Sequence, residues 1–181
     1  MTTEISIYSH PNSPDQIMTA TILSTITTFC ANPRLSDGLV RELLQKDYTD
    51  LWVAYSRNEN KLTIKGLMNI KIHEDGTPEV KTICARGAGG LFMNLVTQLY
   101  KDPIFVYSVE DAYDFYKKYG FVHTGHIIDV EERYKNKTNY VKNLLGIENF
   151  MVFDKKLQKT PSTRRRSRSR SRARQVKRGK S

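Results

Sequence analysis

Apolar and polar positions in the first part of the chain follow a strand spacing and then a helical one. Residues 5 to 8 form a short β-like run. Ser13-Pro14-Asp15 is typical of a helix start and leads into residues 17 to 29. Ser36-Asp37 precedes a second amphipathic stretch, whose apolar face holds Leu39, Leu43 and Leu44. The pattern therefore predicts one strand followed by two helices.

Three β-rich runs come next, at residues 51 to 56, 62 to 72 and 79 to 85. The first two are separated by a polar turn of hairpin length, and the third follows a segment dense in turn-forming residues. Strands joined by such short connections pair antiparallel. The sequence thus predicts three strands in meander order.

A glycine-rich turn, C-A-R-G-A-G-G at residues 84 to 90, leads from the third run into a predicted helix at residues 91 to 100. A strand is expected at residues 104 to 108. Strand, helix and strand in this order need a crossover connection, which predicts one parallel pair of strands. The buried face of the helix is expected to hold Leu91, Leu95 and Leu99.

One helix and two strands are expected to close the fold. The helix, residues 110 to 119, ends at Gly120, a common helix C-terminal residue. The strands are residues 121 to 129 and 149 to 157, with a polar, partly helical insertion at 131 to 145 between them. The predicted fold class is α/β (α+β mixed), with a mostly antiparallel twisted sheet and helices on both faces.

The chain has 181 residues and a formal net charge of +10, and the whole excess lies near its C-terminus. From residue 160 onward there are eight Arg, two Lys and no acidic residue, so the preceding part is neutral. We expect one folded domain at residues 1–158 and a tail at residues 159–181. The nucleic-acid-binding candidates of this tail are its basic residues from position 160 onward: Arg164, Arg165, Arg166, Arg168, Arg170, Arg172, Arg174, Lys177, Arg178 and Lys180.

The tail holds too few apolar residues to bury a core, so disorder is expected. Residues 166 to 172 alternate Arg and Ser, and resemble protamine-like tails and the arginine-serine segments of RNA-associated proteins. Arginine matches phosphate geometry, which predicts sequence-independent binding of DNA or RNA. A nuclear-import or solubility tail is the alternative. Phosphorylation would lower the charge of the tail at the candidates Ser167, Ser169 and Ser171.

Two cysteines, Cys30 and Cys84, match no metal-ligand spacing. They are interpreted as reduced thiols of an intracellular protein, with a single disulfide as the alternative. The N-terminus lacks the basic and apolar regions of a signal peptide, and no apolar run reaches membrane-spanning length. We therefore expect an intracellular protein with no membrane partner. The basic tail favours the nucleus or a nucleic-acid-containing particle such as a virion.

The glycine-rich turn has the composition of an anion cradle. Gly87, Gly89 and Gly90 let the backbone adopt positive φ and bring N–H groups close to a ligand. The helix that follows adds its positive N-terminal end, which suits phosphate or pyrophosphate. A tight chain reversal without a ligand is the alternative. No Gly-Lys-Ser/Thr follows and the spacing does not fit a dinucleotide fingerprint, so ATP and NAD are not expected.

Two motifs in this region are similar to those of the GCN5-related N-acetyltransferase (GNAT) superfamily, whose members transfer acetyl from acetyl-coenzyme A (acetyl-CoA) to an amine. Residues 84 to 89, C-A-R-G-A-G, resemble the pyrophosphate loop Q/R-x-x-G-x-G/A, with Cys84 where Gln or Arg is usual. A register starting at Arg86 is the alternative. Residues 112 to 121, A-Y-D-F-Y-K-K-Y-G-F, resemble A-x-x-F-Y-x-K-x-G-F. Val109 stands where the family has Asn.

The resemblance implies a sheet of about six to seven strands and an acetyl-CoA site beside the glycine turn. A backbone N–H near Cys84 would polarise the thioester carbonyl, and Tyr116 would protonate the departing sulfur. A core tyrosine with a satisfied hydroxyl is the alternative for Tyr116. Glu79 is a weaker candidate for the base, and a solvated strand face is its alternative. The predicted acetyl-CoA-binding residues are Ile83, Cys84, Ala85, Arg86, Gly87, Ala88, Gly89 and Gly90.

His123 and His126 could transfer protons, although an exposed strand or turn is the commoner explanation for them, and no metal site is expected. The acceptor amine is open among a protein lysine, a protein N-terminus, a polyamine and a small amine. Two hypotheses follow. The chain is an N-acetyltransferase tethered to nucleic acid by its tail, or it is a catalytically inactive binding or packaging protein that acts mainly through the tail.

Overall fold

The computed structural model describes residues 2–30, 32–59, 61–101 and 103–158. The elements along the chain are β1 (Glu4–Ser9), α1 (Gln16–Phe29), α2 (Pro33–Gln45), β2 (Asp50–Asn58), β3 (Lys61–Ile72), β4 (Pro78–Ala85), α3 (Gly89–Leu99), β5 (Ile104–Tyr107), the 3-10 helix η1 (Glu110–Ala112), α4 (Tyr113–Lys118), β6 (Val122–His123), the 3-10 helix η2 (Thr124–His126), α5 (Val130–Arg133), α6 (Asn139–Leu144), β7 (Phe150–Phe153) and α7 (Lys155–Gln158).

The strands form one seven-stranded sheet in the order β1-β2-β3-β4-β5-β7-β6. Strands β1 to β4 pair antiparallel, and so do β5, β7 and β6. Among the described strands, the one parallel pair is β4 with β5, and it is the pair that the crossover through α3 requires. The predicted mixed, mostly antiparallel sheet is therefore confirmed.

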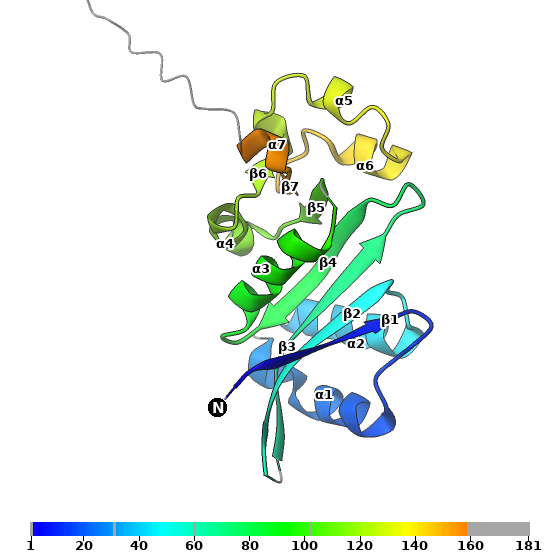
Figure 1. Ribbon diagram of the computed structural model, residues 1–181, viewed down its shortest axis with the longest axis vertical. Helices are drawn as coiled ribbons and strands as arrows, with labels where there is room; N and C mark the ends of the chain where they lie inside the picture. Colours follow the sequence, from blue (N-terminus) through cyan, green and yellow to red (C-terminus); the bar gives the residue numbers. More distant parts are fainter. Residues whose placement is uncertain (1, 31, 60, 102, 159–181) are drawn as a thin grey trace, which may run out of the picture.

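Helices cover both faces of the sheet (Figure 1). On one face, α3 and α4 pack over the centre, and Phe92, Met93 and Tyr116 join the apolar cluster there. On the other face, α1 and α2 cover β2 to β4 through Ile22, Leu39 and neighbouring apolar residues. A third cluster joins β5 and β7 to α5 and α6. The centre of the sheet is thus enclosed where β4 meets β5.

Helix α3 is rotated relative to its predicted orientation. Phe92, Met93 and Val96 are fully buried, whereas Leu91 and Leu99 are 38% and 60% exposed. The stripe with Phe92, Met93 and Val96 and the stripe with Leu91 and Leu99 are both apolar. Periodicity alone therefore does not show which stripe is buried. The glycines decide, because a Cβ on Gly89 would lie 3.1 Å from Cζ of Phe115. The glycine side of α3 therefore faces α4, and this fixes which apolar stripe meets the sheet.

Helix α2 begins at Pro33, before the predicted start at Ser36-Asp37. The side chain of Asn32 accepts hydrogen bonds from the N–H groups of Arg34 and Leu35, at 3.0 and 3.3 Å. Asn before Pro is a strong helix start, because it satisfies N–H groups that have no partner within the helix. Ser36 lies within the first turn and donates from Oγ to the Pro33 carbonyl (2.8 Å).

The two closing strands are shorter than predicted. Strand β6 ends at His123, because buried Thr124 donates from Oγ1 to the Phe150 carbonyl and accepts from the Gly146 N–H, both at 3.0 Å. The chain turns there into η2. Strand β7 ends at Phe153, since the Asp154 carboxylate accepts from the Lys156 N–H (2.8 Å) and starts α7.

The expectation of two reduced thiols is wrong in this structure, where a disulfide joins Cys30 to Cys84. Cys30 follows the last residue of α1, and Cys84 lies on β4 with its side chain toward the same face. Packing of α1 and β4 brings the two residues together across 54 positions of sequence. The argument from free thiols to an intracellular location is therefore lost.

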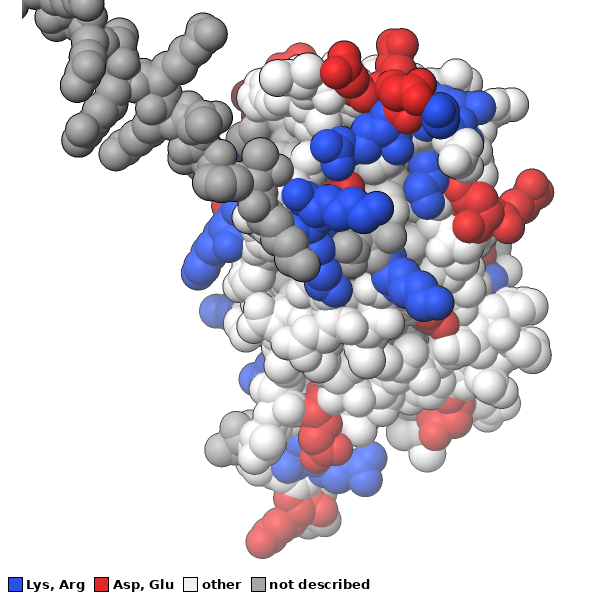
Figure 2. Space-filling view, turned by 45° about the horizontal axis from the view of Figure 1, so that its top comes forward, with Lys and Arg blue, Asp and Glu red and all other residues white. Residues whose placement is uncertain are grey.

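Charge is unevenly spread over the neutral domain. Lys and Arg side chains gather on the face where the described chain ends, and Asp and Glu lie mainly around them (Figure 2). The predicted tail, including its nucleic-acid and phosphorylation candidates, lies outside the described residues. Among the residues that are described, no helix has the length and apolar character needed to cross a membrane.

Candidate functional site

Strands β4 and β5 separate soon after they meet. Their parallel pairing is limited to Glu79 with Phe105 and Val80 with Val106. Strand β4 continues to Ala85, while β5 ends at Tyr107, and the next strand in the sheet beyond β5 is β7. The part of β4 after Val80 therefore has an edge without a strand partner, and the glycine turn lies at the end of that edge.

A β-bulge at Lys81 sets the direction of the side chains on this edge. Val80 pairs with Ile70 and Thr82 pairs with Asn69, so Lys81 has no opposite residue on β3. One extra residue reverses the alternation of side chains along the strand. Ile83 and Ala85 consequently point toward α3 and α4, together with Val80, and Thr82 and Cys84 point toward α1 and α2.

The backbone of the same segment alternates as well. The Arg86 N–H donates to the Lys65 carbonyl (2.8 Å), and the register pairs Cys84 with Leu67 and Ala85 with Gly66. In an antiparallel ladder, successive residues turn their N–H and C=O groups to opposite sides. The N–H and C=O groups of Ile83 and Ala85 therefore face away from β3, into the space between β4 and β5.

The glycine turn joins this edge to the start of α3. Gly87 has φ of +79°, and a Cβ placed on it would meet no heavy atom within 4 Å, so the turn needs glycine and is open. Ala88 precedes the helix and provides no side-chain cap, and Phe92 N–H is the first to donate into the helix, to the Ala88 carbonyl (3.1 Å). The N–H groups between them have the position of helix N-terminal anion donors.

Helix α4 borders the turn on one side. A Cβ on Gly90 would lie 2.5 Å from the hydroxyl oxygen of Tyr119, and one on Gly89 would lie 3.1 Å from Phe115. The absence of side chains at both glycines therefore favours the close approach of Phe115 and Tyr119 to α3. The two aromatic rings narrow the space over the start of α3 without covering Gly87.

Tyr116 lies on α4 in the same apolar cluster as Ile83, Ala85 and Ala88, so the structure brings the predicted proton donor close to the glycine turn. The side chain is only 3% exposed, and burial raises the pKa of its phenol. Its ring packs against Phe115 and Phe121. A phenol with a raised pKa remains protonated at neutral pH and can donate its proton.

Glu79 lies where β4 and β5 are still paired, at the other end of β4 from the glycine turn. It is completely buried, so the alternative of a solvated strand face is wrong. Its carboxylate contacts Nε2 of His73 at 2.8 Å, the Tyr140 hydroxyl at 3.1 Å and Nζ of Lys81 at 3.4 Å. Burial works against the charge of Lys81, but Glu79 and Tyr140 outweigh it and raise the pKa of that amine.

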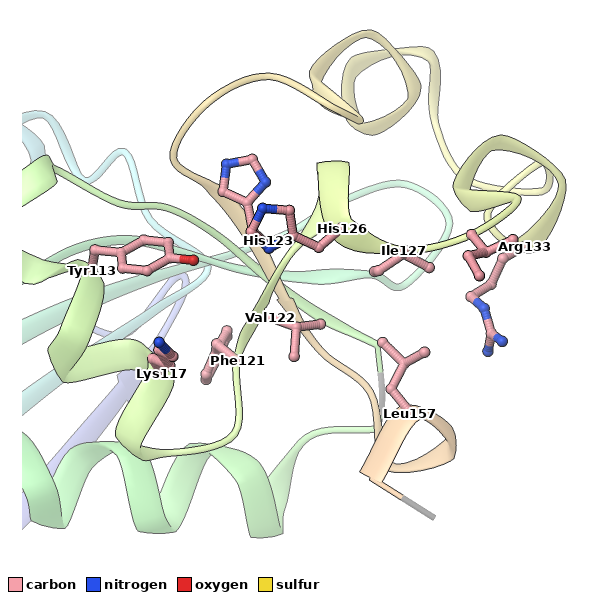
Figure 3. Close-up of a pocket in the computed structure, with 10 residues that line it drawn as sticks. Tyr113, Lys117, Phe121, Val122, His123, His126, Ile127, Arg133 and Leu157 are labelled. Atoms are coloured by element: carbon pink, nitrogen blue, oxygen red, sulfur yellow. The ribbon is translucent and has the colours of Figure 1, made fainter. Parts of the chain in front are cut away.

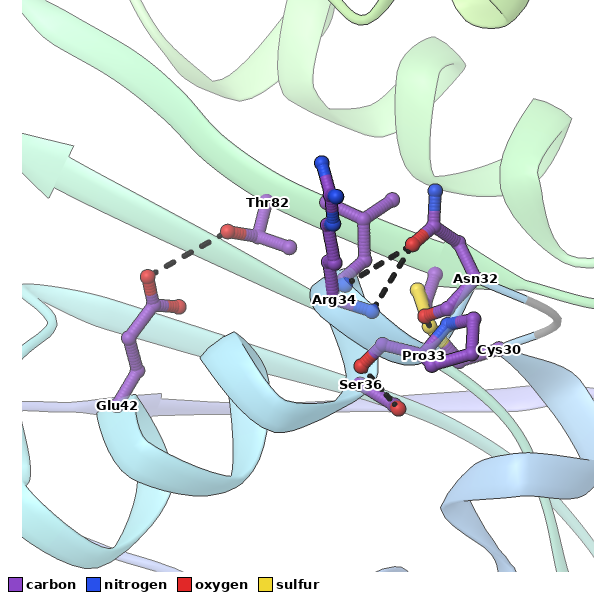
Figure 4. The surroundings of a disulfide bond; sticks show 9 residues. Cys30, Asn32, Pro33, Arg34, Ser36, Glu42 and Thr82 are labelled. Atoms are coloured by element: carbon purple, nitrogen blue, oxygen red, sulfur yellow. Dashed lines mark hydrogen bonds between the residues drawn. A yellow bond between two sulfur atoms is a disulfide. The ribbon is translucent and has the colours of Figure 1, made fainter.

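A second carboxylate, which the sequence did not indicate, lies closer to the gap. Glu42 of α2 accepts from Nδ2 of Asn69 at 2.6 Å and from Oγ1 of Thr82 at 3.4 Å (Figure 4). Burial raises the pKa of Glu42, and the Asn69 hydrogen bond and the Lys81 charge oppose this without cancelling it. Its position between Leu39 and Leu43, beside the apolar stripe of α2, is the sequence signal that could have identified it.

A hollow of about 630 Å³ is lined by Asn32, Pro33 and Arg34 from the start of α2 and by Asp111 of η1. Residue 111 follows β5, and the start of α2 is linked to β4 by the Cys30–Cys84 disulfide. Figure 4 shows Arg34 next to this disulfide, with Glu42 farther along the same helix. The hollow therefore opens between the ends of β4 and β5.

His123 and His126 are separate from the gap. They line a cavity at the far edge of the sheet with Tyr113 and Lys117 of α4 (Figure 3). The described residues include no group of three or more His, Cys, Asp or Glu side chains that could hold a metal ion. The structure thus brings Ile83 to Gly90 together with Tyr116, and separates them from Glu79 and the two histidines.

Comparison with solved structures identifies the fold. The chain resembles GCN5 from Tetrahymena with a TM-score of 0.53 at 12% sequence identity, covering 82% of this chain and 94% of that one. The catalytic domain of Tetrahymena GCN5 histone acetyltransferase in complex with coenzyme A gives a TM-score of 0.46 at 14% identity, with 83% and 90% covered. A GNAT-family acetyltransferase from Bacillus cereus gives 0.44 at 11% identity, with 71% and 90% covered.

No protein-family model matches the chain, and no curated protein matches it in sequence. The seven-stranded sheet of the described residues and the glycine turn into α3 nevertheless agree with what the resemblance implied. This chain has the fold of the GCN5-related N-acetyltransferases.

Proposed function

We propose that this chain is an acetyl-CoA-dependent N-acetyltransferase. The observation that carries the proposal is the gap between β4 and β5, where the backbone groups of Ile83 and Ala85 have no strand partner and lead directly into the glycine turn. An extended ligand with amide groups can pair with such an edge as an added strand does. The pantetheine arm of coenzyme A is extended and contains two amides.

The glycine turn fits the remaining part of the same ligand. N–H groups at the start of α3 and the open, positive-φ Gly87 suit a pyrophosphate, and exposed Arg86 adds a positive charge beside it. Bound acetyl-CoA would supply an acetyl group activated as a thioester. Residues 83 to 90 then have the roles that the sequence predicts, with the strand edge holding the pantetheine arm and the turn holding the pyrophosphate.

The side chains beside the gap support acetyl transfer to an amine. The amine nitrogen attacks the thioester carbonyl carbon, a backbone N–H of Ile83 or Ala85 stabilises the developing oxyanion, and the carbon–sulfur bond breaks. The Tyr116 hydroxyl gives its proton to the departing thiolate. The proton lost by the amine passes to a carboxylate. Product release and proton exchange with water then restore both side chains.

Glu42 fits the role of base better than Glu79. Glu79 is buried among three partners at the paired end of β4, whereas Glu42 lies by Thr82, on the segment of β4 that has left β5. The raised pKa of Glu42 also brings its proton affinity closer to that needed near neutral pH. We assign the general base to Glu42, and give Glu79 the role of holding Lys81 and His73 in place.

The acceptor would approach from the α1–α2 side, through the hollow between Arg34 and Asp111. A protein lysine, a protein N-terminus, a polyamine and a small amine are all compatible with this opening. The basic tail would hold the enzyme on DNA or RNA and so bring acceptors bound to nucleic acid within reach. This setting favours the nucleus or a nucleic-acid-containing particle.

A calorimetric titration of the full chain with acetyl-CoA tests the proposal. We expect a dissociation constant in the micromolar range and much weaker binding of adenosine 3′,5′-bisphosphate, which has phosphates for the tail but no pantetheine arm. A panel of lysine peptides, N-terminal peptides and polyamines, analysed by mass spectrometry, then identifies the acceptor. Equal binding of both ligands, or none at high micromolar concentration, would reject the acetyl-CoA site.

One feature favours the alternative of an inactive binding or packaging protein. Phe115 and Tyr119 lie close to the first residues of α3 and narrow the space over them. In that case the tail carries the main activity: the titration shows no selective binding of acetyl-CoA, and a separate filter-binding measurement with DNA or RNA still shows binding by the full chain. Acetyl-CoA binding and nucleic-acid binding, measured separately, therefore distinguish the enzyme from the inactive binding protein.

A further inference from the structure

A cavity of about 420 Å³ lies between α4, β6, η2, α5 and α7, away from the acetyl-CoA gap. Helix α4 separates the two regions. Its Phe115 and Tyr119 face α3, whereas Tyr113 and Lys117 face the cavity. Pairs spaced by four residues share one side of a helix, so the cavity is independent of the site proposed for acetyl transfer. The proposal below goes beyond that function.

The walls of the cavity are flat rings on one side and aliphatic side chains on the other (Figure 3). The rings of Tyr113 and His123 are 6.2 Å apart, and those of His123 and His126 are 4.9 Å apart and tilted by 34°. Nδ1 and Nε2 of His123 lie 3.1 Å from the backbone N–H groups of Gly125 and Asn149, respectively, and in the neutral imidazole one of the two nitrogens accepts a hydrogen bond that orients the ring. The aliphatic side is formed by Val122, Ile127, Ile128 and Leu157.

The charged residues of the cavity are all of one sign. Lys117 and Arg133 are exposed and lie at opposite ends, and none of the lining residues is acidic. Nζ of Lys117 lies 6.0 Å from the centre of the Tyr113 ring. The nearest carboxylate to Arg133 is Asp154, at 3.9 Å, which also accepts from the Tyr134 hydroxyl and the Lys156 N–H. The cavity therefore suits a ligand with a flat, apolar body and an anionic group.

The position of the cavity narrows the class of ligand. Leu157 lines it, and the described chain ends one residue later, where the basic segment of the sequence begins. Basic side chains gather on this same face of the domain (Figure 2). From residue 160 onward the sequence holds ten basic residues and no acidic one, which favours a polyanionic ligand for this protein. Bases that stack on rings and phosphates that meet Lys and Arg belong to nucleic acids.

We propose that this cavity binds one unpaired nucleotide of a single-stranded nucleic acid, with its base against the Tyr113 and His123 wall and its phosphates at Lys117 and Arg133. A base inside a duplex is stacked and paired, so it does not reach such a cavity. The tail contacts phosphates and carries no base information. The cavity therefore gives the chain a preference for unpaired strands that the arginine tail alone lacks.

The test compares two labelled octamers with the full chain by fluorescence anisotropy. One is single-stranded oligothymidylate, and the other has the same number of phosphates but abasic sugars. The tail binds both alike, because they have the same charge. We expect the octamer with bases to bind about 5-fold to 10-fold more tightly, as stacking of one base predicts. Equal affinity for the two octamers overturns the proposal.

Variants test whether the cavity causes the tighter binding of the octamer with bases. Lys117→Ala/Arg133→Ala removes both cations, and Val122→Trp fills the cavity, so each is expected to bring the ratio of the two affinities close to one. Arg41→Ala/Lys61→Ala, two exposed residues far from the cavity, removes the same charge and should leave the ratio unchanged. A thermal melt identifies variants that do not fold. If the ratio persists in the folded Lys117/Arg133 variant, or falls equally in the control, base binding occurs elsewhere and the proposal is wrong.

Discussion

The side-chain amide of Asn69 on β3 donates a 2.6 Å hydrogen bond to the carboxylate of Glu42 on α2. The other amide proton points to the Asp47 carbonyl (3.2 Å), which fixes the orientation of Asn69. The Asn69 carbonyl oxygen is buried and has no partner among the described residues. A buried amide thus holds one acid next to the gap in the sheet.

Glu42→Gln is expected to lower the rate of acetyl transfer about 10²-fold to 10⁴-fold at saturating acetyl-CoA, the usual range for loss of a general base. In the parent chain, the rate should fall as the pH drops through the pKa of Glu42, because the protonated acid accepts no proton. Burial raises that pKa, so the fall begins at higher pH than an ordinary carboxyl gives. In the pH–rate profile of the variant, this fall in rate at low pH should be absent.

Stability measurements separate this role from a structural one. A carboxyl with a raised pKa is favoured in its neutral form, so its stabilising effect is complete at low pH and is lost as the pH rises through its folded pKa. Glu42→Gln should therefore be at least as stable as the parent at neutral pH. Glu74→Gln, at an exposed turn residue, is the control. Loss of activity only in parallel with loss of folded protein would contradict a catalytic role.

Tyr116→Phe is expected to leave acetyl-CoA affinity nearly unchanged and to slow transfer about 10²-fold or more. Burial is the only cause of the raised pKa of the Tyr116 phenol, with no contribution from a hydrogen bond to a described residue, so removal of the hydroxyl is expected to break no protein hydrogen bond. The ring contacts with Phe115 and Phe121 remain. Rates with acetyl-CoA and with a thioester whose leaving thiol is more acidic provide the check. The transfer rate of the variant should be closer to that of the parent with the second thioester, whose thiolate leaves without needing a proton. An equal loss of rate with both thioesters argues against proton donation by Tyr116.

Gly90→Ala tests the packing that shapes the cradle. The added Cβ would lie 2.5 Å from the Tyr119 hydroxyl oxygen, while the next ring atom, Cζ, is at an ordinary 3.5 Å. We expect a loss of about 1 to 3 kcal/mol in the free energy of unfolding, measured with urea. In a Tyr119→Phe background the clash is absent, and the helix preference of Ala over Gly should make the change neutral or favourable by up to about 1 kcal/mol. An equal loss of unfolding free energy in both backgrounds would show that the strain does not come from the contact with the Tyr119 hydroxyl.

Local signals in the sequence predicted the strands, the glycine turn and the end of α4. Gly120 has φ of +85°, as a glycine at the end of a helix requires. These features depend on residues close in sequence. The bulge at Lys81 depends on how β4 aligns with β3, and no residue near Lys81 indicates it. The sequence therefore located the loop but not the side-chain directions on the strand before it.

The site residues also divide into those that a local motif predicts and those that depend on tertiary packing. Tyr116 and residues 83 to 90 were predicted because they lie within or directly beside the two motifs, and Tyr116 shares an apolar cluster with Ile83, Ala85 and Ala88. Glu42 was missed because α2 looks like an ordinary amphipathic helix, and only its packing on β3 and β4 places that acid by Thr82. The Cys30–Cys84 disulfide was not the preferred interpretation, because the spacing of two distant cysteines carries no information on contact.

Cys30→Ser/Cys84→Ser is expected to lower the free energy of unfolding by about 4 kcal/mol in the chain-entropy model, since the bond closes a loop of 54 positions. Urea unfolding of the parent with and without reductant should give the same difference. The variant also frees the end of α1 from β4, next to the proposed acceptor opening. A parent whose stability is insensitive to reductant would show that the bond does not form in solution.

Truncation after Gln158 should abolish binding to duplex DNA and leave acetyl-CoA binding intact. The whole positive excess lies beyond this residue, so the remaining domain has no net attraction for a polyanion. For the full chain, engagement of about half of the tail charges predicts a slope of about −4 to −5 for log affinity against log salt concentration. Filter binding over a range of salt concentrations measures both. If the truncated chain retains duplex binding with the same slope, the basic face of the domain, and not the tail, carries the interaction.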